Sequence, residues 1–159
     1  VSIIRPALVY GKNMKGNLAA MYEGISSGWF PPLPETSNKR SMICVKDLVR
    51  AIIFITENTK ANSNIFIATD GYEYSTRDIY KALCSASSRG VPNWVVPVFL
   101  IQFLAIIGDV LKFLPINSYK YRKLFGSECY SSSKLHDLGF EPIYNFHSYY
   151  KKNSHNSLD

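Results

Sequence analysis

The sequence has 159 residues, a length that fits one domain with a sizeable core and argues against two full-sized domains. Hydrophobic residues make up 47% and charged residues 19%, a balance that excludes a disordered, collagen-like or coiled-coil protein. The net charge of +6 and the pI near 9.2 favour anionic partners such as phosphate groups, nucleic acid or an acidic membrane surface.

Three cysteines, Cys44, Cys84 and Cys129, are widely spaced, without a Cys-x-x-Cys pair or a histidine at metal-ligand spacing. This usage predicts a reducing compartment and no structural zinc. The first residues have neither an initiating Met nor the order of a signal peptide, which predicts a chain entered in mid-domain.

The first third of the chain is predicted to form a strand, a helix and a loop. Residues 1–9 are largely apolar and contain Arg5 and Pro6, which predicts a buried strand with the proline near an end or at an irregular edge. Apolar residues at helical spacing predict a helix over 16–28, with Asn17 as its N-cap and a glycine stop. The proline-rich stretch 29–39 predicts an exposed loop.

The middle of the chain alternates strands with helices. Residues 40–45 predict a short strand that leads directly into a helix beginning near Asp47. Residues 64–69 predict a second buried strand, and a capping-box-like Ser75-x-x-Asp78 predicts a helix to about Ala86. This alternation predicts the α/β class with at least some parallel pairing.

Residues 94–114 form the most apolar stretch. Gln102, Asp109 and Lys112 interrupt it, while Phe99, Phe103, Ile106, Val110 and Phe113 repeat at three or four. The pattern favours a packed or interfacial helix over a bilayer span, and makes residues 97–114 a candidate for peripheral membrane contact.

The last part of the chain contains two short predicted helices, over 120–126 and 134–138, the second stopped by Gly139. Residues 146–159 are polar and are predicted to be a fraying tail, which leaves 1–145 as the folded part.

Three residues could bind phosphate. Arg40 follows a loop and precedes a strand, where a guanidinium could hold a phosphate bidentately, although a solvated surface charge is the simpler interpretation. Asn17 at a helix start could present an amide and backbone N–H groups to an anion, or serve only as the N-cap. Arg122, in a basic cluster, could add a second contact or lie on a solvated helix face.

The sequence contains no Gly-x-Gly-x-x-Gly, Walker or Gly-x-Ser-x-Gly loop. Several other motifs, taken together, resemble those of a known family. In order and spacing they resemble the C-terminal half of an extended short-chain dehydrogenase of the NAD-dependent nucleotide-sugar epimerase/dehydratase family. They are Arg5-Pro6-Ala7-Leu8-Val9-Tyr10-Gly11, Gly16-Asn17-Leu18, the run from Lys39-Arg40 to Val45-Lys46-Asp47-Leu48, Ser133-Lys134 and Leu138-Gly139-Phe140-Glu141-Pro142.

The resemblance implies a fold and a set of binding residues. The fold would be the C-terminal part of an extended Rossmann-type epimerase: the last sheet strands plus a small α/β substrate-binding domain. The implied roles are Pro6 beside the nicotinamide of NAD, Asn17 and Leu18 at the nucleotide diphosphate, Leu33 in the base-binding loop, Arg40 on a phosphate and Arg122 near a second one. Leu8 stands where many of these epimerases have Asn, which alters the substrate contact from that strand.

The function that the resemblance implies is the binding of a nucleotide sugar in the cytoplasm, with a UDP-hexose as the favoured one, for surface polysaccharide synthesis. The family's glycine-rich loop and its Tyr-x-x-x-Lys pair would precede Val1, so this chain is expected to be inactive alone and to contribute no catalytic residue and no metal ligand. Nucleic acid is not an expected partner, and homodimerisation of a full-length enzyme stays open. The alternatives are a non-catalytic nucleotide-sugar-binding remnant, or a membrane-surface protein that uses helix 97–114.

Overall fold

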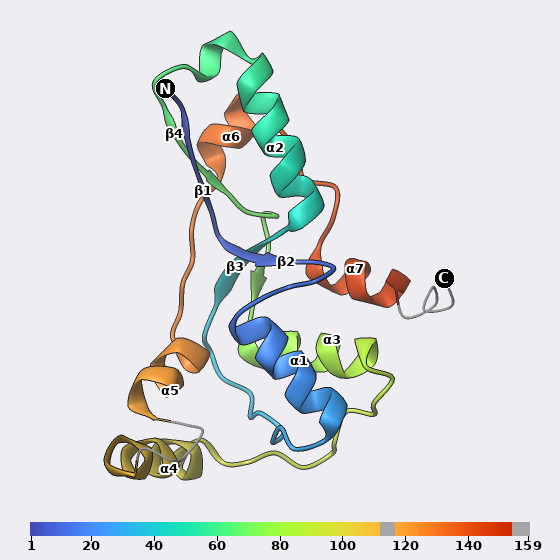
Figure 1. The fold of residues 1–159 in the computed structure, drawn as a ribbon, viewed down its shortest axis with the longest axis vertical. Helices are drawn as coiled ribbons and strands as arrows, with labels where there is room; N and C mark the ends of the chain where they lie inside the picture. Colours follow the sequence, from blue (N-terminus) through green and yellow to red (C-terminus); the bar gives the residue numbers. More distant parts are fainter. Residues whose placement is uncertain (112–116, 154–159) are drawn as a thin grey trace.

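The computed structural model describes residues 1–111 and 117–153. Over these ranges five short strands are interspersed with helices in the first half of the chain, and only helices follow in the second half (Figure 1). Strands β1 (Ile3–Pro6) and β4 (Ile65–Ala68) form a parallel pair. Strands β2 (Leu8–Tyr10), β3 (Arg40–Cys44) and β5 (Glu73–Tyr74) form a second sheet in the order β2-β3-β5, with β2 parallel and β5 antiparallel to β3. The predicted α/β class with parallel pairing is confirmed.

The helices gather in three groups. Figure 1 shows α2 and α6 beside the β1–β4 pair, α1, α3 and α7 together below β2 and β3, and α4 with α5 at the far end. Their bounds are α1 (Asn17–Ser27), α2 (Val45–Glu57), α3 (Thr76–Ala86), α4 (Val98–Val110), α5 (Ser118–Phe125), α6 (Ser133–Asp137) and α7 (Phe146–Asn153), with a 3₁₀ turn over Thr59–Ala61.

Strand β3 separates two hydrophobic cores. All five of its residues are buried, and successive side chains point to opposite faces. Met42 and Cys44 join the core under α1, α3 and α7, whereas Ile43 joins the core under α2 and α6. The central strand therefore fixes both groups of helices relative to each other.

Most of the predicted elements are confirmed to within a residue or two. The 40–45 strand, the helix near Asp47, the 64–69 strand and the two short helices after residue 117 all form. The predicted capping box is present: Ser75 Oγ accepts from the Asp78 N–H, and the Asp78 carboxylate accepts from the Ser75 N–H.

The single strand predicted over residues 1–9 is wrong. The chain forms β1 and β2, which pair with different partners, and the break falls at Ala7. Pro6 has no N–H to donate to a ladder, and the next N–H, that of Ala7, bonds to the Ala68 carbonyl at 3.0 Å. The chain then leaves β4 and continues beside β3.

The N-cap predicted for the first helix is also wrong. Gly16 occupies the cap with φ of 71°, a left-handed conformation that favours glycine, and Asn17 is the first helical residue. The Gly16 cap supplies no side-chain hydrogen bond, and the first turn of α1 contains no acidic residue. The amino end of α1 therefore lacks the usual side-chain cap.

The tail predicted from residue 146 requires a correction over its first part. Residues 146–153 form α7, and Phe146, Tyr149 and Tyr150 are buried. Phe146 packs between Tyr10 and Tyr150, with ring centroids 5.0 and 4.9 Å away. The aromatic residues at positions 1, 4 and 5 of this segment outweigh its polar composition, so the packed body extends beyond residue 145. Residues 154–159 lie outside the described ranges.

The apolar helix predicted over 94–114 forms as α4 over Val98–Val110, and residues 112–116 lie outside the described ranges. The predicted apolar face does not pack: Phe99, Phe103, Ile106 and Val110 are exposed, while Ile101 and Ala105 are buried. Across residues 1–111 and 117–153, no helix has the length and apolar character needed to cross a membrane.

Candidate binding site

A pocket of about 340 Å³ opens at the carboxyl ends of β2 and β3. Its lining residues run from Leu8 to Lys15 and include Val45, the first residue of α2. Ligands of parallel α/β sheets bind at the carboxyl ends of strands. Lys12 and Lys15 are exposed at this pocket and give it a positive charge. The pocket is therefore suited to an anionic ligand.

Helix α7 holds the loop that forms the pocket. The Lys12 N–H donates to the Tyr149 hydroxyl at 3.0 Å, and the Tyr150 hydroxyl donates to Met14 Sδ at 3.2 Å. Sequence reasoning missed Lys12, Lys15 and Tyr149. The two lysines could have been found from the basic run that directly follows a strand, but the contact with α7 joins residues 137 positions apart.

The floor of the pocket includes Tyr10, which belongs to a buried hydrogen-bonded group. The hydroxyls of Tyr10 and Tyr74 donate to the same Asp70 oxygen at 3.1 and 2.8 Å. Burial, followed by the Asp70 charge, raises the pKa of Tyr10 far above its ordinary value, and burial raises the pKa of Asp70. The burial of Tyr10 and its hydrogen bond to Asp70 favour a structural role for its hydroxyl.

The amino end of α1 follows the pocket loop directly. Asn17 is exposed and begins the helix, while Leu18 is buried in the core. Backbone N–H groups at a helix start point outward, and the helix dipole adds partial positive charge there. Asn17 thus lies where an anion could bind. At Leu18 only the backbone N–H could contact such an anion, because the side chain is buried in the core.

Arg40 begins β3 and is only 9% exposed, so its interpretation as a solvated surface charge is wrong. A terminal guanidinium nitrogen donates to the Lys123 carbonyl of α5, while Nε has no hydrogen-bond partner among the described residues. Burial lowers the pKa of Arg40, and the nearby Glu128 opposes this shift. A buried cation with an unsatisfied N–H favours a negatively charged partner.

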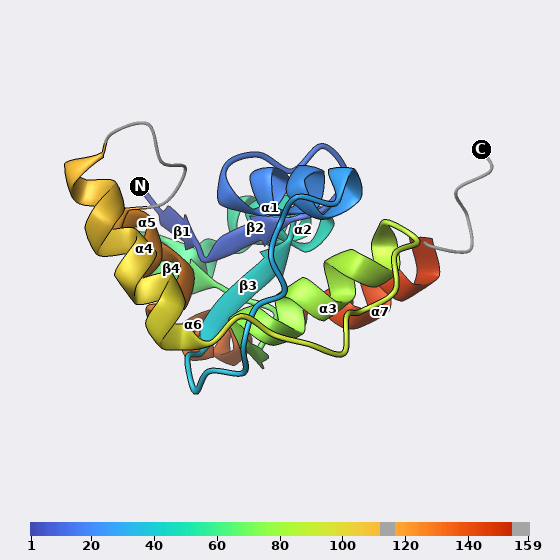
Figure 2. The ribbon, with the colours of Figure 1, turned by 90° about the horizontal axis from the view of Figure 1, so that it is seen from below.

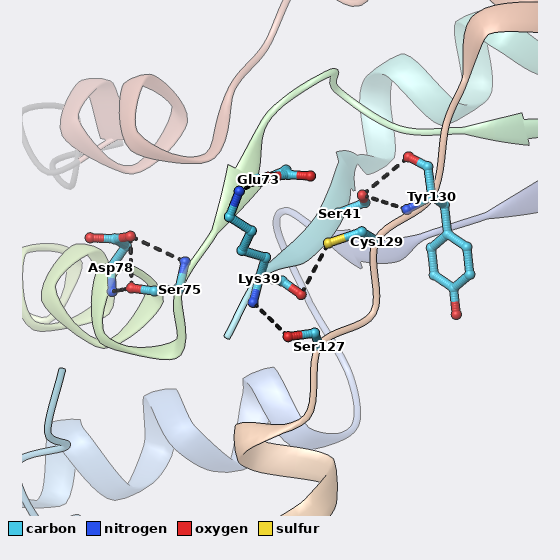
Figure 3. A network of polar contacts seen from close by, with 8 residues as sticks. All are labelled: Lys39, Ser41, Glu73, Ser75, Asp78, Ser127, Cys129 and Tyr130. Atoms are coloured by element: carbon cyan, nitrogen blue, oxygen red, sulfur yellow. Dashed lines mark hydrogen bonds and ion pairs between the residues drawn. The ribbon is translucent and has the colours of Figure 1, made fainter. Parts of the chain in front are cut away.

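The segment after α5 covers the start of β3 and accounts for this burial (Figure 3). The Ser41 N–H donates to the Glu128 carbonyl at 2.9 Å, and the Glu128 N–H donates to the Lys39 carbonyl at 2.8 Å. Figure 3 shows Ser127 and Tyr130 also bonded to this strand, at Lys39 and Ser41 respectively. The crossing segment therefore acts as an additional short strand beside β3.

The remaining predicted site residues lie in different surroundings. Pro6 is exposed at the end of β1, two residues before the pocket lining begins. Leu33 is buried at 1% exposure, and its carbonyl accepts from the Arg77 guanidinium at 2.6 Å. The side chains of Leu33 and Leu18 pack in the same hydrophobic core as Tyr10 of β2 and Met42 of β3. The backbone at both leucines therefore lies near these two strands.

Helix α5 places Arg122 near Arg40 in the fold. Arg122 is exposed, and the carbonyl of its neighbour Lys123 accepts the hydrogen bond from Arg40. The charge of Arg122 contributes to the lowered pKa of the Asp109 carboxyl. The main cause of that lowering is the hydrogen bond from Ser118. The start of β3 therefore lies against a basic helix.

A Tyr-x-x-x-Lys spacing occurs twice in the sequence. Tyr130 and Lys134 do not line the pocket, and the other pair, Tyr119 and Lys123, lies on α5. Tyr119 is 64% exposed, and Lys123 lies over its ring and pairs with Glu128 at 3.8 Å. Neither residue lines the pocket. We assign no catalytic role to this pair.

Comparisons with known proteins agree with the resemblance. A UDP-glucose 4-epimerase of Vibrio cholerae is 35% identical over 130 residues, which cover 79% of this chain and 34% of that protein. An N-acetyl-alpha-D-glucosaminyl-diphospho-ditrans,octacis-undecaprenol 4-epimerase of Escherichia coli O157:H7 is 22% identical over 149 residues, 91% of this chain and 45% of that protein. This chain is related to the UDP-glucose 4-epimerase-like, NAD-dependent epimerases. No family model matches the sequence.

Solved epimerase structures share the fold. The UDP-N-acetylglucosamine 4-epimerase of Bacillus cereus superposes with a TM-score of 0.66 at 16% identity, over 99% of this chain and 46% of that one. The UDP-glucose 4-epimerase of Thermus thermophilus, in complex with NAD, gives 0.62 at 16% identity, over 99% and 47%. The predicted Rossmann-type epimerase fold is confirmed. The chain spans about a third to a half of the length of the curated epimerases it matches.

Proposed function

We propose that this chain is the nucleotide-sugar-binding portion of an NAD-dependent epimerase or dehydratase that acts on a UDP-hexose for surface polysaccharide synthesis in the cytoplasm. The observation that carries the proposal is Arg40, a buried guanidinium with an unsatisfied Nε at the start of β3. A diphosphate supplies the charge and the oxygens that such a group favours.

Two further features support a diphosphate sugar as the ligand. Strand β3 runs from Arg40 to Cys44, which pairs with the pocket-lining Tyr10, and these four steps span about 13 Å at about 3.3 Å each. A ligand with a diphosphate at Arg40 would therefore extend its sugar toward the pocket. The uncapped start of α1, with Asn17 and the backbone of Leu18, would bind the same diphosphate.

The remaining predicted residues receive supporting roles in this proposal. The exposed Arg122 would add a second phosphate contact, since α5 packs on Arg40. The loop around Leu33 would border the base through its backbone, because the side chain is buried. The two curated relatives are named for UDP-glucose and for a diphospho-undecaprenol-linked sugar, and these ligands share the sugar diphosphate that Arg40 would recognise.

The pocket wall fits one face of the nicotinamide of NAD. Leu8, Val9 and Val45 make the wall apolar, and Gly11 packs so closely that a Cβ there would lie 2.6 Å from Val45 Cγ1. Pro6, at the start of this segment, would lie beside the ring. Bound NAD would supply the hydride acceptor, while this chain orients the sugar and excludes water from the pocket.

Binding of UDP, measured by isothermal titration calorimetry on the 159-residue chain, tests the proposal. We expect UDP to bind at least about tenfold more tightly than uridine, because charged hydrogen bonds to the diphosphate contribute about 1.5–3 kcal/mol. With NAD and UDP-glucose we expect no conversion, since the sequence contains no glycine-rich dinucleotide loop. Equal affinity for UDP and uridine would contradict the diphosphate assignment.

A further inference from the structure

Helix α4 exposes a broad apolar face. Its buried stripe consists of Ile101, Ala105 and Gly108, which follow one another at four and three residues. The opposite face carries Phe99, Phe103, Ile106 and Val110, which are 66%, 60%, 61% and 78% exposed. Leu100, Leu104 and Leu111 are also exposed and widen this face. A single exposed apolar residue is ordinary, but a contiguous group of this kind marks an interaction site.

Basic helix α5 lies along one edge of this face. Gln102 donates from Nε2 to the Tyr121 hydroxyl at 2.9 Å, and Asp109 accepts from the Ser118 N–H at 3.0 Å. These two polar residues of α4 occupy the edge between its buried stripe and its exposed apolar face. Figure 2 shows α4 at the outer margin of the molecule, with α5 directly behind it.

The residues of α5 make that edge positively charged. Lys120 and Lys123 are exposed, Lys123 also pairs with Glu128 at 3.8 Å, and the neighbouring Tyr119 is 64% exposed. An apolar helix face bordered by lysines and an amphipathic aromatic ring is the pattern of helices that lie in the interface of a bilayer. Lysines near an anionic leaflet add electrostatic attraction to the burial of the apolar face.

We propose that α4 and α5 form a docking surface for an anionic phospholipid membrane. In this arrangement α4 lies in the plane of the interface, with Phe99, Phe103 and Val110 among the acyl chains, and α5 contacts the headgroups. A second copy of this chain fits the surface less well. Face-to-face pairing would bring two basic helices together on molecules that each carry a net charge of +6.

The apolar face of α4 does not line the pocket, so it can be tested independently of the nucleotide-sugar site, whereas α5 takes part in both proposals through Arg122 and the Lys123 carbonyl. The chain could bind UDP without binding a membrane, or the reverse. The two proposals can therefore fail separately.

Co-sedimentation with lipid vesicles tests this inference on the whole chain. We expect binding to vesicles of 30% phosphatidylglycerol in phosphatidylcholine, and much weaker binding to vesicles of phosphatidylcholine alone. Phe103→Ser should weaken the binding to the anionic vesicles by about tenfold or more, since it removes a buried aromatic side chain from the complex. Lys120→Gln and Lys123→Gln should each weaken it by about fivefold.

Ile53→Ser is the matched control, because Ile53 is 50% exposed on α2, away from α4. This variant should bind the vesicles as the unmodified chain does. Equal binding by the Phe103→Ser variant, or equal binding to both kinds of vesicle, would overturn the inference. Analytical ultracentrifugation without lipid detects the other occupant. A dimer of the unmodified chain that is lost in Phe103→Ser would overturn the inference and assign the surface to a second copy.

Discussion

Phe146→Ala is expected to lower the free energy of unfolding by about 3–5 kcal/mol, the usual cost of truncating a fully buried aromatic residue. Phe146 has no exposed surface, and its ring packs against Tyr10, Tyr74 and Tyr150. Its N–H also donates to the Tyr74 hydroxyl at 3.0 Å, so it fixes where α7 begins. Urea denaturation followed by circular dichroism measures the effect.

Phe99→Ala is the matched control for this substitution, because Phe99 is 66% exposed on α4. It should change the free energy of unfolding by no more than about 0.5 kcal/mol. Phe146→Leu, which keeps most of the buried volume, should cost less than Phe146→Ala and keeps the test informative if the alanine variant does not fold. A loss below about 1 kcal/mol for Phe146→Ala would return residues from 146 onward to the status of a tail.

Asp47→Ala is expected to lower the free energy of unfolding by about 3 kcal/mol. The Asp47 side chain is fully buried; one oxygen accepts from the Ile143 and Tyr144 N–H groups at 3.0 and 2.8 Å. The other accepts from the Arg50 guanidinium at 2.6 Å. Loss of the carboxylate would leave two backbone N–H groups without their partner and detach the segment that leads into α7.

The exposed Asp137→Ala provides the control for Asp47→Ala, with an expected change within about 0.5 kcal/mol. Thermal unfolding of the two variants under identical conditions gives the comparison. If Asp47→Ala unfolds at the temperature of the Asp137→Ala variant, the carboxylate does not anchor residues 143 and 144.

Local patterns in the sequence predicted the elements well where neighbouring residues decide the structure. The Ser75–Asp78 capping box and the buried strand that begins at Arg40 are examples, because each depends on residues a few positions apart. The first helix was placed correctly, but its cap was not, since Asn and Gly are both accepted N-caps and the sharp turn after β2 favours the glycine.

Contacts between distant residues account for what the sequence did not reveal. Arg40 is buried because the segment after α5 covers the start of β3, and its guanidinium reaches the Lys123 carbonyl 83 positions later. Phe146 is buried because Tyr10 and Tyr74 lie at the point where it arrives. The periodicity of α4 correctly identified a wide apolar face, but periodicity alone does not say whether a protein layer covers that face.

The central claim, that Arg40 binds a diphosphate, is tested most directly by the UDP affinity of Arg40→Lys in isothermal titration calorimetry. Arg40→Lys keeps the charge and loses the planar fork, so we expect the dissociation constant to rise by about 10- to 100-fold. Arg50→Lys, on α2 and outside the pocket, should leave it unchanged. Unchanged UDP affinity in Arg40→Lys, together with a lowered unfolding midpoint, would contradict the account and assign Arg40 a structural role.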